Sequence, residues 1–377
     1  MKKSSADRKQ INLLEFAGER ERPESPEKIA KRRPILAKKE MPKELLALSN
    51  QKSIYVTTLN RKEKPRIEIE EIGRQGAETL WKVDVKGDDK TWVAPRLGQS
   101  AERHPPEYYV RDVDPGINFK GHCTEWMDKF FTPPIIQETP RYMRRFNGRM
   151  VRPNIVFGND NRQVHSNFSY PWRCVGRIAN SDGRTGSAAL IANNAIVTAA
   201  HLVPFTAWYG LPWWVEFVAS YFDGTGFSSF CSHIRSTEPV SGSPTGYDWA
   251  VMKLYTPLGD TLGWFGYNGY SSDWEDEPYW TIVGYPGAIA GGQRPSWQTG
   301  IRILDDDSDD YGGRELEHKG DTSGGNSGGP MFSWWNDDPR LIGVVSGYET
   351  DFNQDALNVS AGGSGFTNLC RWARQNW

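Results

Sequence analysis

From about residue 154 to the C-terminus, the chain consists of short runs of β-branched and aromatic residues separated by glycine-rich turns. Such runs are typical of β-strands, and glycine gives the backbone the freedom that tight turns require. Long helical heptads are not apparent, and we expect only residues 368–377 to form a short helix that closes the domain. The pattern therefore predicts an all-β domain over residues 155–377.

The first 154 residues differ in composition from the rest. Residues 1–50 are rich in charged residues and proline, which predicts a largely disordered segment. Short helices are expected within it at residues 11–16 and 43–48. We interpret residues 1–154 as an N-terminal pro-region or accessory segment that precedes the all-β domain.

Two further parts follow within this N-terminal region. Between residues 51 and 95, apolar and polar residues alternate in the runs 54–56, 67–70 and 80–85, as they do in half-buried strands. This alternation predicts a small β unit. Residues 96–154 are rich in proline and arginine, which predicts an extended connector.

Charge and hydrophobicity exclude two classes of partner. The net charge of −2 and the isoelectric point near 6.4 provide no overall positive field to hold a polyanion, so we expect no nucleic acid. No run of about 18 apolar residues occurs, so we expect no membrane-spanning helix. The N-terminal residues show charge without a following apolar stretch, and no secretory signal is visible.

Cysteines and glycosylation patterns bear on the compartment. Four cysteines allow two disulfides in three pairings and lack the close spacing of a zinc or redox motif; they are Cys123, Cys174, Cys231 and Cys370. Asn167 and Asn358 each begin a glycosylation acceptor pattern, which also occurs by chance in cytosolic proteins. On this basis we expect a secreted, disulfide-bonded glycoprotein.

The glycine-rich loop of residues 320–330 surrounds one serine, Ser327. A loop of this kind bends tightly and exposes a hydroxyl together with backbone amides. Serine becomes a nucleophile only when a base takes its proton, and the oxyanion formed on attack needs preorganised donors. The backbone amides of Gly325 and Ser327 are the candidate donors. A glycine-rich surface turn with an incidental serine is the alternative.

A histidine and an aspartate stand at strand ends where they could assist this serine. The apolar run Ala195-Ile196-Val197-Thr198-Ala199-Ala200 ends at His201, and Asp248 heads another apolar run. An aspartate buried beside a histidine fixes its tautomer and stabilises the imidazolium. Taken singly, each residue is more often structural.

The order of the three residues in the sequence separates two classes of serine hydrolase. Gly325-Asn326-Ser327-Gly328-Gly329 also fits the nucleophile elbow of α/β-hydrolases, which place their histidine after the serine. All histidines of this chain precede Ser327; they are His104, His122, His165, His201, His233 and His318. The α/β-hydrolase interpretation therefore has no base and fails.

Three segments together resemble the signatures of the trypsin and chymotrypsin superfamily of serine proteases: Thr198-Ala199-Ala200-His201, Asp248-Trp249-Ala250-Val251 and Gly325-Asn326-Ser327-Gly328-Gly329-Pro330. The resemblance covers about residues 155–377. It implies two antiparallel six-stranded β-barrels with the cleft between them. It also implies a serine endopeptidase with His201, Asp248 and Ser327 as its triad, acting through an acyl-enzyme. A non-catalytic, protease-like binding protein is the alternative.

A closer likeness concerns activation. Residues 155–164 resemble the mature N-terminus of bacterial glutamyl endopeptidases and related fungal and bacterial trypsin-like proteases. This likeness favours a zymogen that is cut near Ile155. Asn326, however, stands where animal trypsins carry the aspartate that captures the newly formed N-terminus. Activation by that ion pair is therefore not supported.

The same likeness concerns specificity. Thr322 matches a glutamate-binding threonine of the glutamyl endopeptidases, but Val345 stands where their histidine should be. Glutamate specificity is consequently not supported. Asp321 occupies the offset at which trypsins bind lysine or arginine, although a solvated turn aspartate is the equal alternative. Ser346 and Gly347 resemble the strand that pairs with substrate backbone.

Remaining expectations concern ligands and partners. The acidic run of residues 305–310 has oxygens that favour calcium but no ordered ligand spacing, which favours a solvated loop. We expect no metal and no cofactor in the site. The partners are expected to be protein or peptide substrates, and the chain is expected to be a monomer.

Overall fold

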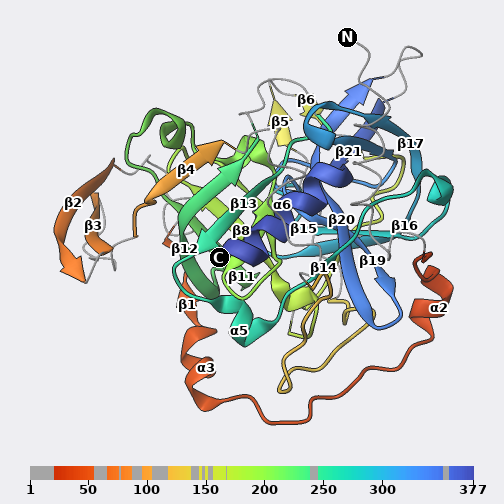
Figure 1. The fold of residues 1–377 in the computed structure, drawn as a ribbon, viewed down its shortest axis with the longest axis horizontal. Helices are drawn as coiled ribbons and strands as arrows, with labels where there is room; N and C mark the ends of the chain where they lie inside the picture. The colour runs from red at the N-terminus through yellow and green to blue at the C-terminus, as the bar shows by residue number, and fades with distance from the viewer. Residues whose placement is uncertain are drawn as a thin grey trace.

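The computed structural model describes residues 21–54, 66–75, 78–86, 96–103, 118–136, 144–146, 149–151, 156–166, 168–237, 245–350 and 356–377. Two β-sheets that lie side by side contain most of the strand residues, and a helix lies at the C-terminus (Figure 1). This arrangement confirms the all-β prediction. No helix among the described residues is long and apolar enough to cross a membrane.

Six antiparallel strands close the first barrel. They are β8 (Val175–Asn180), β9 (Thr185–Leu190), β10 (Ala195–Thr198), β11 (Val215–Phe222), β12 (Thr225–Ser236) and β13 (Ala250–Leu254). The pairing runs β8-β9-β10-β13-β12-β11 and returns to β8. Nearly every residue of β8, β9, β10 and β11 is buried, because the barrel interior and the packed surroundings cover both faces of these strands.

The second sheet curls in the same way but is not closed by a strand pairing among the described residues. Its order is β17-β18-β21-β20-β19-β15-β16-β7, with β14 beside β20. The strands are β7 (Gln163–Val164), β14 (Gly266–Tyr267), β15 (Trp280–Gly284), β16 (Ser296–Ile301), β17 (Ile303–Ser308), β18 (Arg314–His318), β19 (Pro330–Trp335), β20 (Asp338–Thr350) and β21 (Ala356–Gly362). Arg302 alone separates β16 from β17, so the chain itself joins the far ends of the curled sheet.

Helices are few and short apart from the last. Helix α6 (Gly363–Asn376) confirms the predicted C-terminal helix and begins five residues earlier than expected, and α5 (Leu258–Leu262) forms one turn. The 3-10 turns are η2 (Trp172–Cys174), η3 (Ala200–Leu202), η4 (Phe205–Tyr209), η5 (Ser272–Trp274), η6 (Ala290–Gly292) and η7 (Asp310–Gly312). One core cluster fills the first barrel and reaches Phe332 and Val344 of the second sheet. A smaller cluster built on Trp274, Trp280 and Trp335 fills the second sheet.

Residues 21–54, which we call the N-terminal strap, are ordered and packed on both sheets. The strap contains α2 (Pro26–Ala30), α3 (Lys43–Leu48) and β1 (Gln51–Lys52), and α3 has the bounds predicted for a helix. Figure 1 shows it running along one edge, from α2 beside the second sheet to β1 beside the first barrel. The prediction of disorder is therefore wrong for this part of residues 1–50, because Ile29 and Glu24 are buried in contacts that lie far away in the sequence.

Other N-terminal predictions have mixed outcomes. Strands β2 (Arg66–Gln75) and β3 (Glu78–Lys86) form a hairpin and contain the predicted runs 67–70 and 80–85. The predicted helix at 11–16 lies outside the described residues, as does most of the run 54–56. Strand β4 (Ser100–Arg103) adds to β12 in parallel, and β5 (Arg144–Phe146) pairs with β6 (Arg149–Val151).

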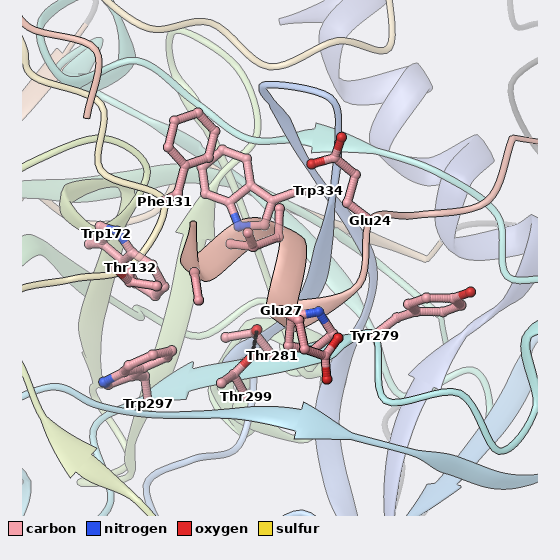
Figure 2. Close-up of a pocket in the computed structure, with 13 residues that line it drawn as sticks. Glu24, Glu27, Phe131, Thr132, Trp172, Tyr279, Thr281, Trp297, Thr299 and Trp334 are labelled. Carbon is pink, nitrogen blue, oxygen red and sulfur yellow. Dashed lines mark hydrogen bonds between the residues drawn. The ribbon is translucent and has the colours of Figure 1, made fainter. Parts of the chain in front are cut away.

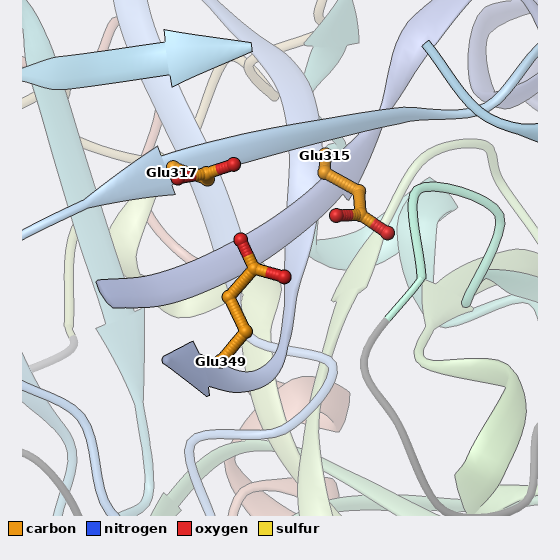
Figure 3. A group of neighbouring side chains, drawn as sticks. All are labelled: Glu315, Glu317 and Glu349. Atoms are coloured by element: carbon orange, nitrogen blue, oxygen red, sulfur yellow. The ribbon is translucent and has the colours of Figure 1, made fainter. Parts of the chain in front are cut away.

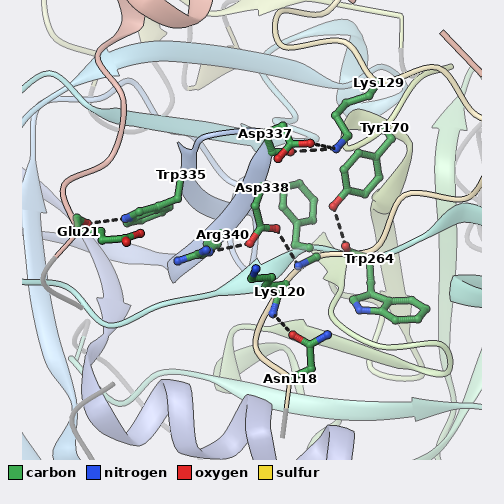
Figure 4. A network of polar contacts seen from close by, with 12 residues as sticks. Glu21, Asn118, Lys120, Lys129, Tyr170, Trp264, Trp335, Asp337, Asp338 and Arg340 are labelled. Carbon is green, nitrogen blue, oxygen red and sulfur yellow. Dashed lines mark hydrogen bonds and ion pairs between the residues drawn. The ribbon is translucent and has the colours of Figure 1, made fainter. Parts of the chain in front are cut away.

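The described connector residues 118–136 are attached to the domain by specific contacts (Figure 4). Gly121 N donates to Asp338 Oδ1 over 2.8 Å, and Lys129 Nζ contacts Asp337 in the β19–β20 turn. Met127 and Phe131 are buried in the main core. Trp335 Nε1 in turn donates to the carbonyl of Glu21, at the start of the strap.

Two expectations about covalent modification are corrected. All four cysteines lie within the described residues and are free thiols, so neither of the two expected disulfides is present. Asn358 is fully buried in β21, and its Nδ2 donates to the Gly320 carbonyl over 2.6 Å. A nitrogen that is buried and hydrogen-bonded in the folded chain has no room for a glycan. Asn167 lies outside the described residues.

We predict that Ser53→Ala destabilises the folded chain. Ser53 Oγ donates to Glu216 Oε2 over 2.9 Å, and Glu216 is a fully buried carboxylate of the first barrel. Loss of a donor to a buried charge costs about 1–3 kcal/mol. Chemical unfolding measures the change, with Ser364→Ala as control because Ser364 is exposed and makes only a long bond to Gly312 O. Equal stability of the two variants would show that the strap contact contributes nothing.

Candidate active site

His201 lies at the rim of the first barrel, directly after β10. The small residues Ala199 and Ala200 are buried, so the backbone turns tightly into η3 and carries the imidazole to the surface of the core. The side chain of His201 remains 29% exposed. The imidazole is thus held by packed backbone and is still open on one side.

Asp248 is buried next to His201 and holds it in one orientation. Asp248 Oδ1 accepts the His201 backbone N–H over 2.9 Å, and Oδ2 lies 2.7 Å from His201 Nδ1. The ionised carboxylate is an acceptor only, so Nδ1 carries the proton and Nε2 is left as an acceptor. Ser346 Oγ, on β20 of the second sheet, donates to the same Oδ2 over 2.5 Å.

The pKa values of the pair follow from this geometry. Burial alone lowers the pKa of His201, but the charge of Asp248 and the hydrogen bond to it outweigh burial and raise that pKa above its usual value. Burial alone raises the pKa of Asp248, and the opposing effects of His201 and Ser346 leave that pKa below its usual value. Asp248 therefore stays ionised, and His201 becomes a stronger base.

Ser327 lies in a loop that is pressed between the two sheets. Gly328 has φ +76°, and a Cβ there would lie 2.1 Å from Thr198 Oγ1, so only glycine fits. Ser327 O accepts the Ser187 N–H over 2.8 Å, and Gly328 N donates to Val345 O over 2.7 Å. The loop thus contacts the strand that leads to His201 and also the residue that precedes Ser346.

The hydroxyl of Ser327 has no hydrogen-bond partner in the part of the chain that the structure describes. A Cβ placed on Gly186 would lie 2.4 Å from Leu202 Cδ1 and 2.9 Å from Ser327 O. Gly186 therefore lies between Ser327 and the side chain of Leu202, the residue that follows His201. Catalytic hydrogen bonds are often formed only when substrate is present.

Two backbone amides next to Ser327 belong to peptides whose carbonyls are hydrogen-bonded within the protein. Gly324 O accepts the Gly287 N–H over 2.7 Å, and because a trans peptide directs its C=O and N–H to opposite sides, the Gly325 N–H faces the other way. Asn326 O accepts the Gly329 N–H over 2.8 Å, which turns the Ser327 N–H away in the same manner. Neither amide has an acceptor among the described residues. This pair of donors is suited to a developing oxyanion.

Ser187 is a site residue that the sequence analysis missed. Its Oγ donates to Gly325 O over 2.7 Å and accepts the Tyr285 N–H over 2.9 Å, so it fixes the peptide next to the amide pair. A serine in the middle of the small-residue strand β9 carries no pattern that would reveal this. Its role is evident only from its contacts with the second half of the molecule, which form when the two sheets pack together.

The predicted substrate-binding residues have different surroundings. Asp321 is buried, and its two carboxylate oxygens accept the backbone N–H groups of Phe157 (2.9 Å) and Asn161 (2.7 Å). Burial raises the pKa of Asp321, and these bonds oppose that rise only in part. Thr322 is buried beside it, Ser346 contacts Asp248, and Gly347 is half-buried next to Ser346.

Acidic side chains gather on the second sheet outside this site. The ligand atoms of Glu315, Glu317 and Glu349 lie within 4.8 Å of one another, the two β18 residues facing the end of β20 (Figure 3). Burial, then the charges of Glu349, Asp309 and Asp307, raise the pKa of Glu315 to about 7. Burial and a hydrogen bond to Glu349 raise that of Glu317 to about 8. Crowded oxygens of this kind suit a hard cation, but protons already relieve their repulsion.

The acidic run of residues 305–310 borders this group. Asp306 pairs with Arg314 over 2.9 Å, and Asp309 Oδ2 accepts the Gly246 N–H over 2.9 Å. Its charges are therefore partly used by the protein itself.

A cavity of about 330 Å³ lies elsewhere, beneath α2 of the strap (Figure 2). Aromatic side chains dominate its wall; they are Phe131, Trp172, Tyr279, Trp297 and Trp334. No serine, cysteine or histidine lines it. It is therefore separate from the candidate active site.

The fold and this arrangement define an all-β protein of the serine protease class. The family model described as Trypsin matches residues 158–365, more than half of the chain. The chain therefore belongs to the trypsin family.

Two individual proteins are similar over part of their sequences. A glutamyl endopeptidase of Bacillus licheniformis is 31% identical over 184 residues, which are 47% of this chain and 54% of that protein. The chain thus spans about half the length of that relative. A protein of Bacillus subtilis described as an extracellular metalloprotease is 25% identical over 248 residues, 61% of this chain and 73% of that protein.

Solved structures are similar at lower identity. A Glu endopeptidase has 23% identity and a TM-score of 0.49, covering 59% of this chain and all of its own. The protease Anisep of Arthrobacter nicotinovorans has 18% identity and a TM-score of 0.42, covering 57% of this chain and all of its own.

The raised pKa of His201 predicts the acidic limb of the pH profile. A general base must be neutral, so activity falls as pH drops through the pKa of His201 in the free enzyme. Because that pKa lies above 6.5, kcat/KM should reach half its plateau at a pH above 6.5. Initial rates on a peptide substrate between pH 5 and 9 measure it. A midpoint well below 6.5 would contradict the electrostatics described for Asp248 and His201.

A second pH prediction concerns Glu317. Its folded pKa of about 8 exceeds the ordinary value of 4.5, so the stability linked to its proton is present below pH 4.5 and is lost as pH rises through about 8. Glu317→Gln removes that loss and should raise Tm at pH 9 by about 2–4 °C more than at pH 5. Thermal unfolding measures this, with the exposed Glu275→Gln as control. A difference that does not vary with pH would refute it.

Proposed function

We propose that this chain is a serine endopeptidase in which Ser327 is the nucleophile, His201 the general base and Asp248 the residue that orients the base. The observation that carries the proposal is the buried carboxylate of Asp248, which bonds both the backbone N–H and Nδ1 of His201. That arrangement leaves Nε2 as the acceptor for a serine proton. The two amides beside Ser327 support the same assignment.

The proposed reaction proceeds through an acyl-enzyme. Ser327 Oγ attacks the carbonyl carbon of the scissile peptide while Nε2 of His201 takes the hydroxyl proton. The amides of Gly325 and Ser327 donate to the oxyanion, and Asp248 stabilises the imidazolium. His201 then gives its proton to the departing amine as the C–N bond breaks. Water attacks the ester carbonyl while His201 takes its proton, and His201 then returns that proton to Ser327 Oγ as the ester C–O bond breaks and the acid product leaves.

Substrate and compartment follow as further parts of the proposal. The substrates are proteins or peptides, and the enzyme acts as a monomer. It is secreted, which the description of one relative as extracellular supports. Each oxygen of Asp321 already accepts a backbone hydrogen bond, so the proposal includes no specificity for basic residues. Ser346 and Gly347 are the proposed backbone-pairing residues of the cleft.

The proposal also divides the chain. Residues 1–154 form a pro-region or accessory segment, and residues 155–377 form the protease domain of an enzyme made as a zymogen. The contacts of the strap and of residues 118–136 with both sheets support an N-terminal region that stays attached to the domain even after the chain is cut.

We predict that Ser327→Ala abolishes peptide hydrolysis while the fold is kept, because the hydroxyl is the nucleophile and alanine fits the same loop. His201→Ala should match it. Loss of either residue typically lowers turnover by about 10⁴ to 10⁶. Rates on a peptide library, with circular dichroism as a check on folding, measure both variants. Activity within tenfold of the parent would falsify the assignment, and a parent without activity would favour the binding-protein alternative.

A further inference from the structure

Arg162 is a buried arginine that contacts the loop carrying the amide donors. It lies directly before β7, and its side chain is 2% exposed. Nη1 donates to Ser323 Oγ over 2.9 Å and to Asn326 Oδ1 over 3.0 Å. A charged group at this depth requires a counter-charge, and Asp160 supplies it through bonds from Nε (3.0 Å) and Nη2 (2.9 Å).

The residues that Arg162 contacts are the two ends of one tight turn. Asn326 N donates to Ser323 O over 2.8 Å, and Ser323 N donates to Asn326 Oδ1 over 3.1 Å. Gly325, with φ +102°, lies inside this turn. A single guanidinium therefore fixes both ends of the turn that aims the Gly325 amide, through charge-assisted bonds that are stronger than neutral ones.

The surrounding segment reinforces this contact. The amides of Phe157 and Asn161 are held by Asp321, and β7 pairs with β16 on the other side of Arg162. The backbone is therefore held in place on both sides of Arg162. Its position does not depend on the free end of a chain.

We propose that Arg162 is the positioning residue that holds residues 323–327 in working shape, so that the loop does not require a newly formed N-terminus. The inference rests on the proposed function. Asn326 is uncharged and makes no ion pair with an ammonium, and the cation beside it is already part of the chain. Cleavage of the proposed zymogen upstream of Ile155 is therefore not what orders the amide donors, and its effect is limited to the access of large substrates to the cleft.

Substitution of Arg162 tests the first part of this proposal. Arg162→Met should lower kcat about 10²-fold, the effect of a lost oxyanion donor, with a much smaller change in KM. Arg162→Lys keeps the charge without the forked geometry and should recover part of the loss. If Arg162→Met does not fold, the double variant Asp160→Asn/Arg162→Met is used in its place, because it also removes the Asp160 charge that would be left unpaired.

Arg340→Met is the matched control. Arg340 is equally buried and pairs with the aspartate two residues before it, Asp338, over 2.7 Å, but it contacts no residue of the loop. Its kcat should stay within about twofold of the parent even if stability falls. An Arg162→Met variant with the parent kcat would overturn the proposal, as would equal loss in both variants in proportion to their unfolding.

An uncut chain tests the second part. Replacing Arg141, Arg144, Arg145, Arg149 and Arg152 by glutamine removes the five basic residues nearest before Ile155, and intact mass confirms that the chain stays whole. A small serine-directed phosphonate should label it at a rate within about twofold of the processed enzyme. Labelling that waits for cleavage would overturn the inference. A parent enzyme that is never labelled would instead refute the proposed function.

Discussion

The buried carboxylate of Asp248 joins the two halves of the molecule. Taking a carboxylate out of water costs on the order of several kcal/mol unless donors replace the lost hydration. Here the donors come from His201 on the first barrel and Ser346 on the second sheet. The carboxylate therefore stays ionised while buried because donors from both sheets replace its lost hydration. The same contact that satisfies it also sets the tautomer of the imidazole.

The loop around Ser327 depends on that docking as well. Gly328 leaves room for Thr198, and Ser187 of the first barrel hydrogen-bonds to Gly325 O and Tyr285 N of the second half. A larger side chain at Gly328 would separate the sheets. Arg162 adds a charged clamp on the far side of the same turn. The same contacts thus pack the two sheets together, satisfy buried polar groups and orient the amide donors.

The sequence predicted the elements whose signals are local. Short strands and the C-terminal helix follow from patterns of a few residues, and the pairing of His201 with Asp248 was expected from the resemblance to the trypsin and chymotrypsin superfamily. The packed strap was not predicted, because the burial of Ile29 and Glu24 depends on Phe131 and Trp334, far away in the chain. The partners of Asp321 escaped prediction for the same reason: its offset from Ser327 suggested a pocket, and only the folded chain places residues 157–161 against it. The disulfide prediction failed because a count of cysteines says nothing about the distances between their sulfur atoms, and all four are free thiols in the folded chain.

The most direct measurement is the site of covalent modification by a peptidyl phosphonate. The folded full-length chain is treated with a panel of phosphonates that differ in the side chain before the reactive group, and the adduct is located by peptide mapping. Our account predicts one phosphonyl group per chain, on Ser327, and none after the protein has been unfolded. No adduct with any member of the panel, or an adduct on another residue, would contradict the assignment of Ser327 as the nucleophile.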